Sequence, residues 1–290
     1  MRAEGRNNAR FIPFLWITII ADRWLSFRIS CSQILVEDIA ERSKLAMVVT
    51  NKFGDVDTIT ADLSPDVSGL RVCVELTGLK VGIIEALDIQ YTAFTPELSR
   101  EIDTTCHRLR GLHSFDNLRQ WESVHALREI FRKWGVDPSK YRPSPEALLG
   151  RVIRGEALPR ISTIVDIGNL GAIEMGWSYG CYNRERLSDF IEIRLGKAGE
   201  QYEGIGRQTM RLEGRPVFAD AYGPFGSPIR DSTRTMVTES THDLLAIVCA
   251  PENSCDSILE EAISRLAERL VRWCGAREVK KKIVKGTLDD

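Results

Sequence analysis

The sequence predicts an α+β fold: a mixed β-sheet with helices packed on it. Apolar, β-branched runs typical of buried strands, such as residues 70–76 and 244–250, occur among amphipathic helical patterns. No regular strand–helix–strand repeat orders them, which favours α+β over α/β. The 290 residues are 43% hydrophobic and 28% charged, which is ordinary for a globular chain and sufficient for one large domain or two small ones.

Strands are expected at residues 70–76 and 80–89, where apolar and β-branched residues follow one another. A helix is expected to begin at Thr95, because a Thr cap, Pro96 in the first turn and an early acid are typical of helix starts. A second helix is expected over residues 118–134, with apolar residues at three- and four-residue spacing and a glycine at its end.

Two further helices are expected in the middle of the chain. Prolines exclude a helix before Glu146, so a short one is expected over residues 145–154. Residues 161–175 carry apolar side chains all around the axis, which predicts a largely buried helix. Gly168 and Gly171 lower its intrinsic stability but allow another backbone or a ligand to come close.

The second half of the chain predicts shorter elements. After a glycine-rich turn through residues 176–183, the expected elements are a strand at 189–195, a polar loop at 196–214, a strand at 217–221, a turn at 223–228 and a central strand at 244–250. The clearest helix covers residues 257–273, with Ser257 and Glu260 as a capping box. The charged tail, residues 275–290, is expected to be frayed.

Residues 1–69 are expected to form a partly disordered N-terminal extension, outside a main domain at residues 70–274. The chain starts with a basic segment and an apolar run, FIPFLWITIIA, which is similar to a signal peptide. The run is too short to span a bilayer and no small-x-small cleavage site follows it, so no membrane association is expected. An alternative is that translation naturally starts at Met47.

Composition excludes several function classes. A net charge of −2 and a pI near 6.2 give no global attraction to nucleic acid, so an RNA partner would need a local basic face. Residues 128–160 are rich in Lys and Arg and are either that face or an ordinary solvated surface. The seven cysteines form no C-x-x-C pair, which indicates reduced thiols and a cytoplasmic location. The four histidines lack ligand spacing, so neither a metal nor another cofactor is expected.

Two segments stand out as a candidate site: residues 166–183, DIGNLGAIEMGWSYGCYN, and residues 230–241, RDSTRTMVTEST. A buried Asn169 must find polar partners, so it either ties down a neighbouring turn or faces a ligand. Arg230 and Arg234 flank a polar turn and are either part of that turn or a clamp for a carboxylate or phosphate. Nucleotide-binding and nucleophile motifs are absent, which favours binding of a polar ligand.

Residues 143–187, PSPEALLGRVIRGEALPRISTIVDIGNLGAIEMGWSYGCYNRERL, resemble the B3/B4 tRNA-binding and editing domain of the phenylalanyl-tRNA synthetase beta subunit. Residues 217–248, VFADAYGPFGSPIRDSTRTMVTESTHDLLAIV, resemble the end of that domain. The chain looks closer still to free-standing proteins made of this domain alone. The resemblance covers residues 70–274 and includes no aminoacylation motif. In the synthetase, the domain hydrolyses tyrosine wrongly attached to the phenylalanine tRNA.

The resemblance implies binding of aminoacyl-tRNA, with hydrolysis of a mischarged ester in trans as a further expectation. The residues expected to act in catalysis are Arg234, Ser232 and Asn169. Those expected to bind the ligand are Arg230, Asp231, Thr233, Thr235, Asp166, Gly168, Gly180 and Tyr182. Hydrolysis would use an oriented water, backbone amides near the two glycines and polarisation of the ester by Arg234 or Ser232.

The chain departs from the family pattern at three of these positions. Gly168 stands where the family has Thr, Gly180 where it has His, and Arg234 near a Glu that recognises the tyrosine hydroxyl. We therefore expect a roomier and more positive pocket, shared by the 166–175 helix and the bend near residue 232. The alternatives are a non-catalytic module that binds tRNA or a free amino acid, and a small-molecule hydrolase unrelated to tRNA.

Overall fold

The computed structural model describes residues 69–286 except 115 and 207, together with the backbone of five strands between residues 16 and 62. The chain divides into two compact units, Met1–Val67 and Ser68–Asp290. The first contains the hairpin β1 (Trp16–Ala21) and β2 (Arg23–Arg28), and an antiparallel sheet of β3 (Ile34–Leu35), β4 (Lys44–Thr50) and β5 (Val56–Asp62). The basic segment at residues 1–10 lies outside the described residues, and the alternative start at Met47 stays a prediction.

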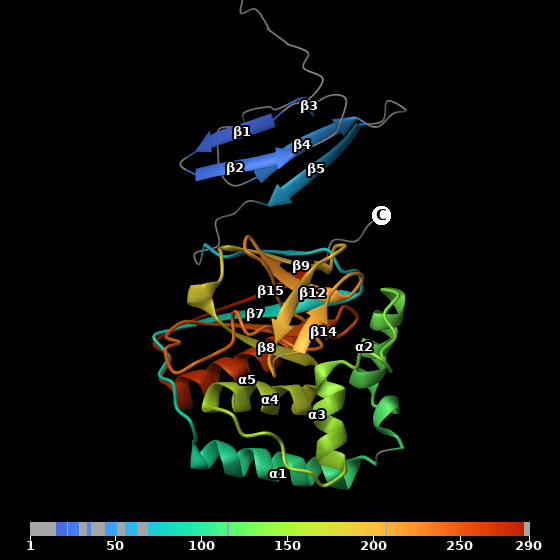
Figure 1. The fold of residues 1–290 in the computed structure, drawn as a ribbon, viewed down its shortest axis with the longest axis vertical. Coiled ribbons are helices and arrows are strands. Elements are labelled where there is room, and N and C mark those ends of the chain that lie inside the picture. Colours follow the sequence, from blue (N-terminus) through green and yellow to red (C-terminus); the bar gives the residue numbers. More distant parts are fainter. Residues whose placement is uncertain are drawn as a thin grey trace, which may run out of the picture. The chain divides into compact units, whose positions relative to one another are not determined.

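The second unit contains two four-stranded sheets and five α-helices (Figure 1). The central sheet has the order β15-β7-β14-β8 and is antiparallel throughout. The second sheet has the order β13-β12-β9-β6 and is mixed, because β6 runs parallel to β9. This confirms the α+β fold with a mixed sheet.

The bounds of the elements in the second unit are β6 (Arg71–Val74), β7 (Leu79–Leu87), α1 (Pro96–Leu112), η1 (Leu118–Gln120), α2 (Glu122–Lys133), α3 (Ser144–Ile153), α4 (Thr163–Met175), β8 (Ser178–Asn183), η2 (Arg184–Arg186), β9 (Phe190–Leu195), β10 (Gln201–Gly204), β11 (Gln208–Arg211), β12 (Pro216–Asp220), β13 (Gly223–Gly226), β14 (Leu244–Pro251), α5 (Asp256–Cys274) and β15 (Glu278–Lys285).

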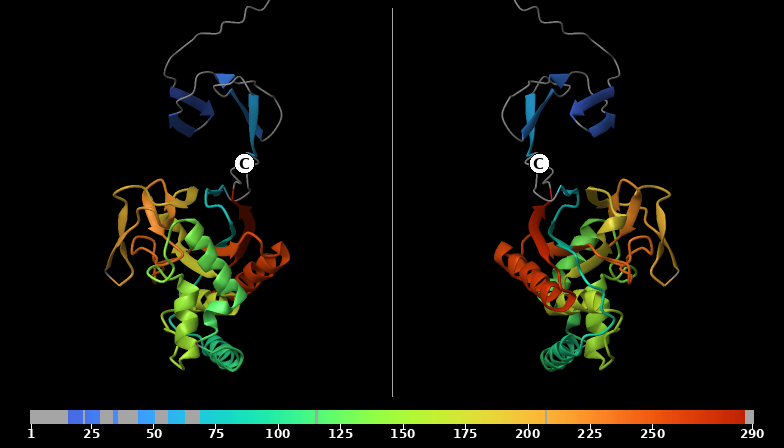
Figure 2. Two further views of the ribbon diagram at one scale, coloured as in Figure 1. Left: turned by 90° about the vertical axis from the view of Figure 1, so that its right-hand side faces the viewer. Right: turned by 90° about the vertical axis from the view of Figure 1, so that its left-hand side faces the viewer.

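These elements form three layers, helices on sheet on sheet, because the central strands alternate between two cores. From β14, Ala246 and Val248 face the helical core, whereas Leu245 and Ile247 face the second sheet. Figure 2 shows the orange strands of the second sheet on the side of the unit away from the red helix α5. Both faces of the central sheet are thus buried, as the continuous apolar run of β14 predicts.

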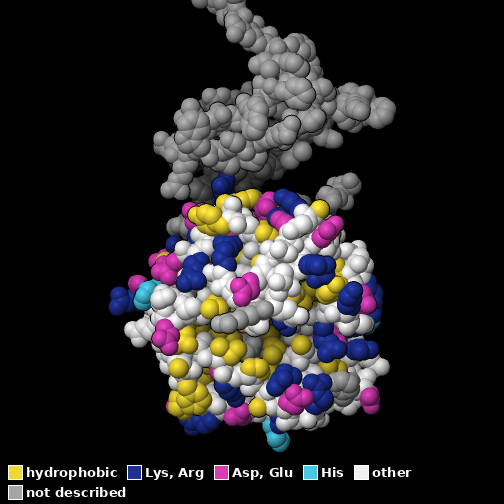
Figure 3. Space-filling view, viewed as in Figure 1, with side chains coloured by type: hydrophobic (Ala, Val, Ile, Leu, Met, Phe, Trp, Pro, Cys, Tyr) yellow, Lys and Arg dark blue, Asp and Glu magenta, His cyan; other side chains and the backbone are white. Residues whose placement is uncertain are grey.

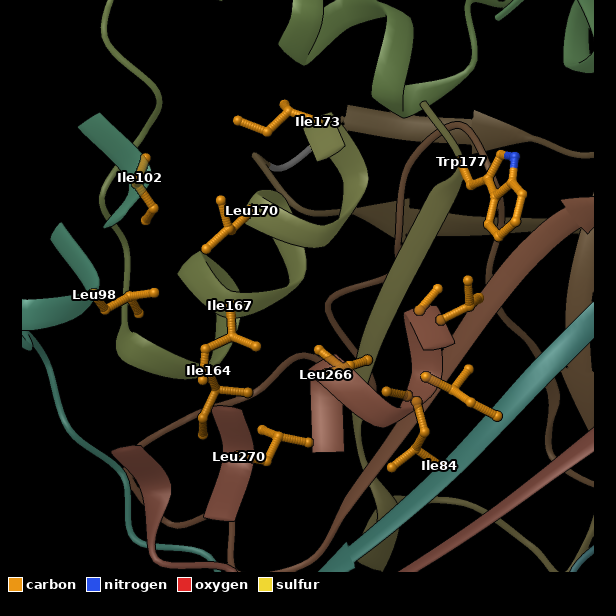
Figure 4. Packing of buried hydrophobic residues seen from close by; sticks show 14 of the residues in the cluster. Ile84, Leu98, Ile102, Ile164, Ile167, Leu170, Ile173, Trp177, Leu266 and Leu270 are labelled. Carbon is orange, nitrogen blue, oxygen red and sulfur yellow. The ribbon is translucent and has the colours of Figure 1, made fainter. Parts of the chain in front are cut away.

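The helical core is built mainly from branched aliphatic side chains. Ile164, Ile167, Leu170 and Ile173 of α4 are fully buried among side chains of α1, α5 and β7 (Figure 4). The predicted buried helix is therefore present, from its Ser162 cap to a left-handed glycine after its last residue. Among the described residues, no helix combines the length and apolar character that crossing a bilayer requires.

Several local predictions need correction at helix starts. The expected helix over residues 118–134 is a short 3-10 turn followed by α2, and Trp121 at the N-cap position of α2 makes no side-chain cap hydrogen bond. The clearest helix, α5, starts at Asp256 after Cys255, so the Ser257–Glu260 capping box is wrong. The Thr95 cap position is right, but its hydroxyl bonds Thr163 Oγ1 at 2.8 Å and makes no cap hydrogen bond.

Four segments expected as turn, loop or frayed tail contain strands. The glycine-rich turn is largely β8, the polar loop contains the β10–β11 hairpin, the turn after β12 contains β13, and the tail contains β15. In each case pairing with a distant or adjacent strand provides hydrogen-bond partners for the backbone N–H and C=O groups. Local composition does not reveal such pairing. The lysine-rich β15 is a sheet edge, where charged side chains oppose further strand pairing.

Arg269 of α5 joins three helices through ion pairs. Its Nη2 lies 2.6 Å from Glu101 Oε1 of α1 and 2.7 Å from Glu174 Oε1 of α4, and Nη1 lies 2.7 Å from Glu174 Oε2. The Arg269 side chain is 10% exposed and that of Glu174 is 12% exposed. Removing the guanidinium would leave the largely buried Glu174 carboxylate without a partner, whereas the Glu101 side chain is 37% exposed and can be solvated.

We therefore expect Arg269→Ala to lower the free energy of unfolding by about 3 kcal/mol. The matched control is Arg265→Ala on the same helix, which removes an exposed pair with Glu261 and is expected to cost at most about 0.5 kcal/mol. Urea unfolding followed by far-UV circular dichroism measures both. Equal losses in the two variants would contradict the role given to Arg269.

Candidate functional site

The polar turn after β13 is organised around one buried hydrogen bond. The Tyr182 side chain from β8 is fully buried, and its hydroxyl donates to Asp231 Oδ1 at 2.6 Å. The tyrosine ring packs edge-on against Phe225, with the ring centroids 4.9 Å apart. Tyr182, expected to bind ligand, is therefore a core side chain that fixes the position of the turn.

The hydroxyls of the turn bond within the protein. Ser232 Oγ accepts from the Arg234 amide at 3.1 Å, and Thr235 Oγ1 donates to the Phe225 carbonyl at 3.2 Å. Thr233 Oγ1 donates to the Glu203 carbonyl at 3.2 Å. Ser232 and Thr235 are both buried, so these groups close the turn in the way that side-chain caps do.

The Arg234 guanidinium is held by groups of the protein. It makes a bidentate pair with Asp220 at the end of β12, with Nη2–Oδ1 at 2.8 Å and Nη1–Oδ2 at 3.3 Å. It also donates to the carbonyls of Gly223 and Arg186, each at 3.1 Å. The Asp220 carboxylate is completely buried, so it offsets the charge of Arg234 at close range.

Arg230 lies on the outside of the same turn. Its Nη1 donates to Gln208 Oε1 at 2.9 Å, which links the turn to the β10–β11 hairpin. Its carbonyl accepts from the Tyr202 hydroxyl at 2.5 Å and from Ser227 Oγ at 2.8 Å. Arg230 is exposed, so its guanidinium is more accessible than that of Arg234.

The residues predicted on α4 have a different environment. Asp166 is buried, and its Oδ1 accepts from the Ile161 amide at 3.1 Å at the start of the helix. Gly168 packs against β8, and its amide lies within α4, where the helix ladder uses it. Asn169 is half-buried, and its side-chain amide makes no hydrogen bond to another described residue, so it reaches solvent. Its side chain, like that of the exposed Arg230, is therefore available to a ligand.

Strand β8 separates the two halves of the predicted site. Adjacent strand residues point to opposite faces, so Tyr182 faces the second sheet and Asp231, whereas Cys181 faces α4. An added Cβ on Gly168 would lie 3.0 Å from Cys181 Sγ, which places α4 on the Cys181 side. The structure thus brings Arg234 and Ser232 together with Tyr182 but leaves Asn169 on the other face of the strand.

The expectation of a roomier, more positive pocket is wrong at all three departures from the family pattern. Cys181 lies against Gly168, and the Tyr182 ring lies over Gly180, so neither glycine opens a space. The charge of Arg234 is offset by Asp220. Sequence reasoning missed Asp220, although its position at the end of a strand before a turn, in VFADAYG, is a signal for a functional or structural acid.

Burial shifts the titration of the acids in this region. It raises the pKa of the Asp231 carboxyl to about 6, against the lowering effect of the hydrogen bonds from Tyr182 and the Ser227 amide. Burial also raises the pKa of Asp166 above its usual range, partly opposed by the Ile161 amide. On the other face of β8, burial raises the pKa of the Cys181 thiol to about 12, so this cysteine is not a thiolate nucleophile at neutral pH.

Two surface cavities of the second unit lie away from these residues. One, of about 330 Å³, is lined by Glu85, Leu87, Arg184, Glu185, Leu187, Asp243 and Lys280. The other, of about 770 Å³, runs beside α2 and is lined by Gly78, Gln120, Glu122, His125, Ala126, Glu129, Ile130, Lys133, Glu252 and Asn253. Neither contains a predicted site residue. In the part of the chain that the structure describes, no three His, Cys, Asp or Glu side chains are placed to hold a metal ion.

Comparison with known proteins establishes the family. The model of the B3/4 domain matches residues 126–284, more than half of the chain, and the chain belongs to that family. The phenylalanine–tRNA ligase beta subunit of Thiobacillus denitrificans is 27% identical over 194 residues, which are 66% of this chain and 23% of that protein. The chain therefore spans less than a quarter of this relative. The resemblance inferred from the sequence is confirmed.

A solved structure extends the comparison. An N-terminal fragment of the phenylalanyl-tRNA synthetase beta subunit from Pyrococcus horikoshii is 14% identical, with 74% of this chain and 50% of that chain covered and a TM-score of 0.36. At this similarity the alignment assigns no role to any residue.

The space over Gly180 gives a first prediction for this region. We expect Gly180→Ala to lower the free energy of unfolding by about 2–3 kcal/mol, because the new methyl group would overlap the buried Tyr182 ring. Gly168→Ala is the matched control and is expected to leave the free energy of unfolding nearly unchanged. Alanine stabilises the helix by up to about 1 kcal/mol, and the close contact of the new methyl group with Cys181 Sγ offsets that gain. Chemical denaturation distinguishes them, and a neutral Gly180→Ala would refute the packing argument.

The titration of Asp231 gives a second prediction. Its pKa is higher in the folded chain, about 6, than the ordinary 3.8, so the folded state holds the proton more tightly and loses stability as pH rises from about 4 to about 6. Asp231→Asn retains an acceptor for Tyr182 without the charge. We expect the stability of Asp231→Asn not to fall over this pH range, so that the variant is about 1–2 kcal/mol more stable than the wild type at pH 7.5.

The companion variant Tyr182→Phe removes the donor instead. It should be less stable than the wild type by about 1–3 kcal/mol, and by more at pH 7.5 than at pH 5, because a charged carboxylate then lacks its partner. Denaturation curves at the two pH values measure both effects. Identical pH profiles for the wild type and Asp231→Asn would exclude Asp231 as the titrating group.

Proposed function

We propose that this chain is a B3/B4-type module that binds aminoacyl-tRNA or uncharged tRNA and contributes recognition more than acid–base chemistry. The observation that carries the proposal is that the predicted catalytic side chains already bind other groups of the protein. Arg234 forms an ion pair with Asp220, and the Ser232 hydroxyl accepts a hydrogen bond from the backbone of its own turn. Neither is placed to polarise an ester without breaking these contacts, which supports binding over catalysis by this pair.

The link to tRNA comes from the family and from the surface. A relative of the chain is a tRNA ligase subunit, and the matched region begins within α2. Over α2, α3 and the loop between them, Lys133, Lys140 and Arg142 are exposed, and Figure 3 shows Lys and Arg side chains gathered on that side. Arg128, in contrast, is buried in a pair with Glu146 and supports the fold. A local basic face of this kind attracts phosphates even when the net charge is slightly negative.

Hydrolysis of a mischarged aminoacyl ester in trans is the second candidate, and Asn169 is the observation that favours it. Its side-chain amide is half-buried and makes no hydrogen bond to another described residue, and it lies within α4, the helix that resembles the family helix. An amide offers both a donor and an acceptor, so it suits an aminoacyl group or the water that attacks it. An amino-acid-like ligand would therefore be expected on the α4 side of β8 and not beside Arg234.

Filter binding of tRNA over a series of salt concentrations tests the main proposal. We expect the triple variant Lys133→Gln, Lys140→Gln, Arg142→Gln to bind more weakly. The slope of log affinity against log salt should fall by ~2–3, since each lost phosphate contact contributes ~0.9. The matched control is Arg277→Gln, Lys281→Gln, Lys285→Gln, which removes the same charge from exposed positions at and beside β15.

Equal weakening in both triples would mean that net charge, and not the α2–α3 face, governs binding. Wild-type protein that binds no tRNA at any salt concentration would defeat the proposal and leave a small-molecule role as the better alternative.

Deacylation assays over a panel of mischarged tRNAs decide between the two candidates. If the chain hydrolyses an ester, we expect Asn169→Ala to reduce the rate at least about tenfold while Arg234→Lys, which retains the charge beside Asp220, has little effect. If the wild type releases no amino acid faster than the spontaneous reaction, the catalytic candidate is excluded and the binding module remains.

A further inference from the structure

An exposed tyrosine occupies the tip of the hairpin between β12 and β13. Tyr222 is 73% exposed, the highest value among the large hydrophobic side chains described as exposed. Its amide donates to Asp220 Oδ1 at 3.0 Å, which holds the backbone of the tip. A ring so exposed contributes little burial to folding and stays accessible to a partner.

The Arg234 guanidinium lies near the Tyr222 ring. The guanidinium carbon lies 5.9 Å from the centroid of Tyr222 and 5.9 Å from that of Phe225. The same guanidinium is anchored by the bidentate pair with Asp220 and by the Gly223 carbonyl. A cation held beside an aromatic ring attracts its face, so Arg234 favours ring positions over the hairpin tip.

Arg186 lies beside Arg234, and Arg71 lies on β6 of the same sheet. Arg186 is exposed, and its Nη1 donates to the Arg234 carbonyl at 3.2 Å. The Ala221 amide donates to Ser188 Oγ at 3.1 Å, which joins the hairpin tip to the start of β9. There the guanidinium of exposed Arg71 lies 5.5 Å from the Phe190 ring, which is 37% exposed. Figure 3 shows Lys and Arg among hydrophobic side chains on the face that carries β9 and β12.

The acids in this region are largely neutralised. Asp220 pairs with Arg234, and Asp189 pairs with Arg184 at 2.6 Å. Glu185, beside Arg186, is exposed, and no ion pair is recorded for it among the described residues. Arg71 and Arg186 are exposed arginines that likewise have no recorded ion pair among the described residues, so each can contact a phosphate.

We propose that Tyr222 is a stacking platform for an unpaired base of single-stranded RNA, with Arg186 contacting an adjacent phosphate and Arg234 positioning the ring. Exposed aromatic side chains interleaved with arginines are the pattern by which proteins bind single strands, because every base has a face that stacks. The proposal rests on the proposed tRNA-binding function and names the surface that takes the unpaired nucleotides. It places this surface away from the basic α2–α3 face.

The test compares Tyr222→Ala with the wild type on four RNAs: intact tRNA, tRNA trimmed of its single-stranded 3′ end, a single-stranded 12-mer and a duplex. We expect Tyr222→Ala to bind the 12-mer about 5- to 100-fold more weakly and the duplex equally well. Tyr222→Phe and Tyr222→Trp should retain affinity, because stacking needs the ring and not the hydroxyl. The matched control is Phe94→Ala, an exposed aromatic (55%) before α1, which should change nothing.

The outcomes separate this proposal from the one on which it rests. Loss of affinity for intact but not trimmed tRNA supports stacking of the 3′ end, and loss for both supports stacking of a loop base. Normal binding of every single-stranded RNA by Tyr222→Ala overturns the stacking platform while leaving tRNA binding intact. A wild type that binds no RNA overturns both.

A readout on the unaltered protein guards against a folding defect in the variant. A 12-mer containing 4-thiouridine, irradiated at long wavelength and mapped by mass spectrometry, should cross-link to Tyr222 or its immediate neighbours. Cross-links confined to α2 and α3 would overturn the placement of the single strand.

Discussion

The buried hydrogen bond from Tyr182 to Asp231 is the constraint on which the architecture of this region depends. A carboxylate inside a protein needs a donor, and here a core tyrosine supplies it across the gap between the central sheet and the turn after β13. The tyrosine ring can reach that position only because Gly180 and Gly226 carry no side chains beneath it. This hydrogen bond fixes the turn and with it the Ser232 hydroxyl and Arg234. The Arg234 guanidinium is then positioned to pair with Asp220.

The sequence predicts those parts of the fold in which the signal is local. The apolar positions of α4 surround its axis, the apolar run of β14 is continuous, and Thr95 before α1 and Pro96 at its first position mark its start. Each of these elements could therefore be predicted without knowledge of its neighbours in space. β8 and β15 were not, because their glycines, hydroxyls and lysines have the composition of turns and tails. What makes them strands is pairing with β14 and β7, which lie far away in the sequence.

The site was harder to predict for a related reason. A family alignment shows which side chain is missing at a position, but the space it leaves is set by whatever packs there. Tyr182, two residues along the same strand, fills the place over Gly180, and Cys181 of that strand lies against Gly168 of α4. Likewise an arginine at a family acid position suggests a positive pocket, until Asp220 from another strand is found beside it. Volume and charge at a site are properties of three-dimensional neighbours.

These substitutions together indicate how such a domain can remain folded while its chemistry changes. Each group that sequence reasoning assigned to catalysis on the Tyr182 side of β8 has an internal partner, so altering it costs stability before it alters a reaction. The more accessible groups are of another kind: the half-buried amide of Asn169, the exposed ring of Tyr222, and Lys133, Lys140 and Arg142 over α2, α3 and the loop between them. Amides, rings and cations recognise a base, a phosphate or an aminoacyl group, and none of them is an acid–base catalyst near neutral pH. The exposure of these groups supports the proposal that this surface recognises RNA.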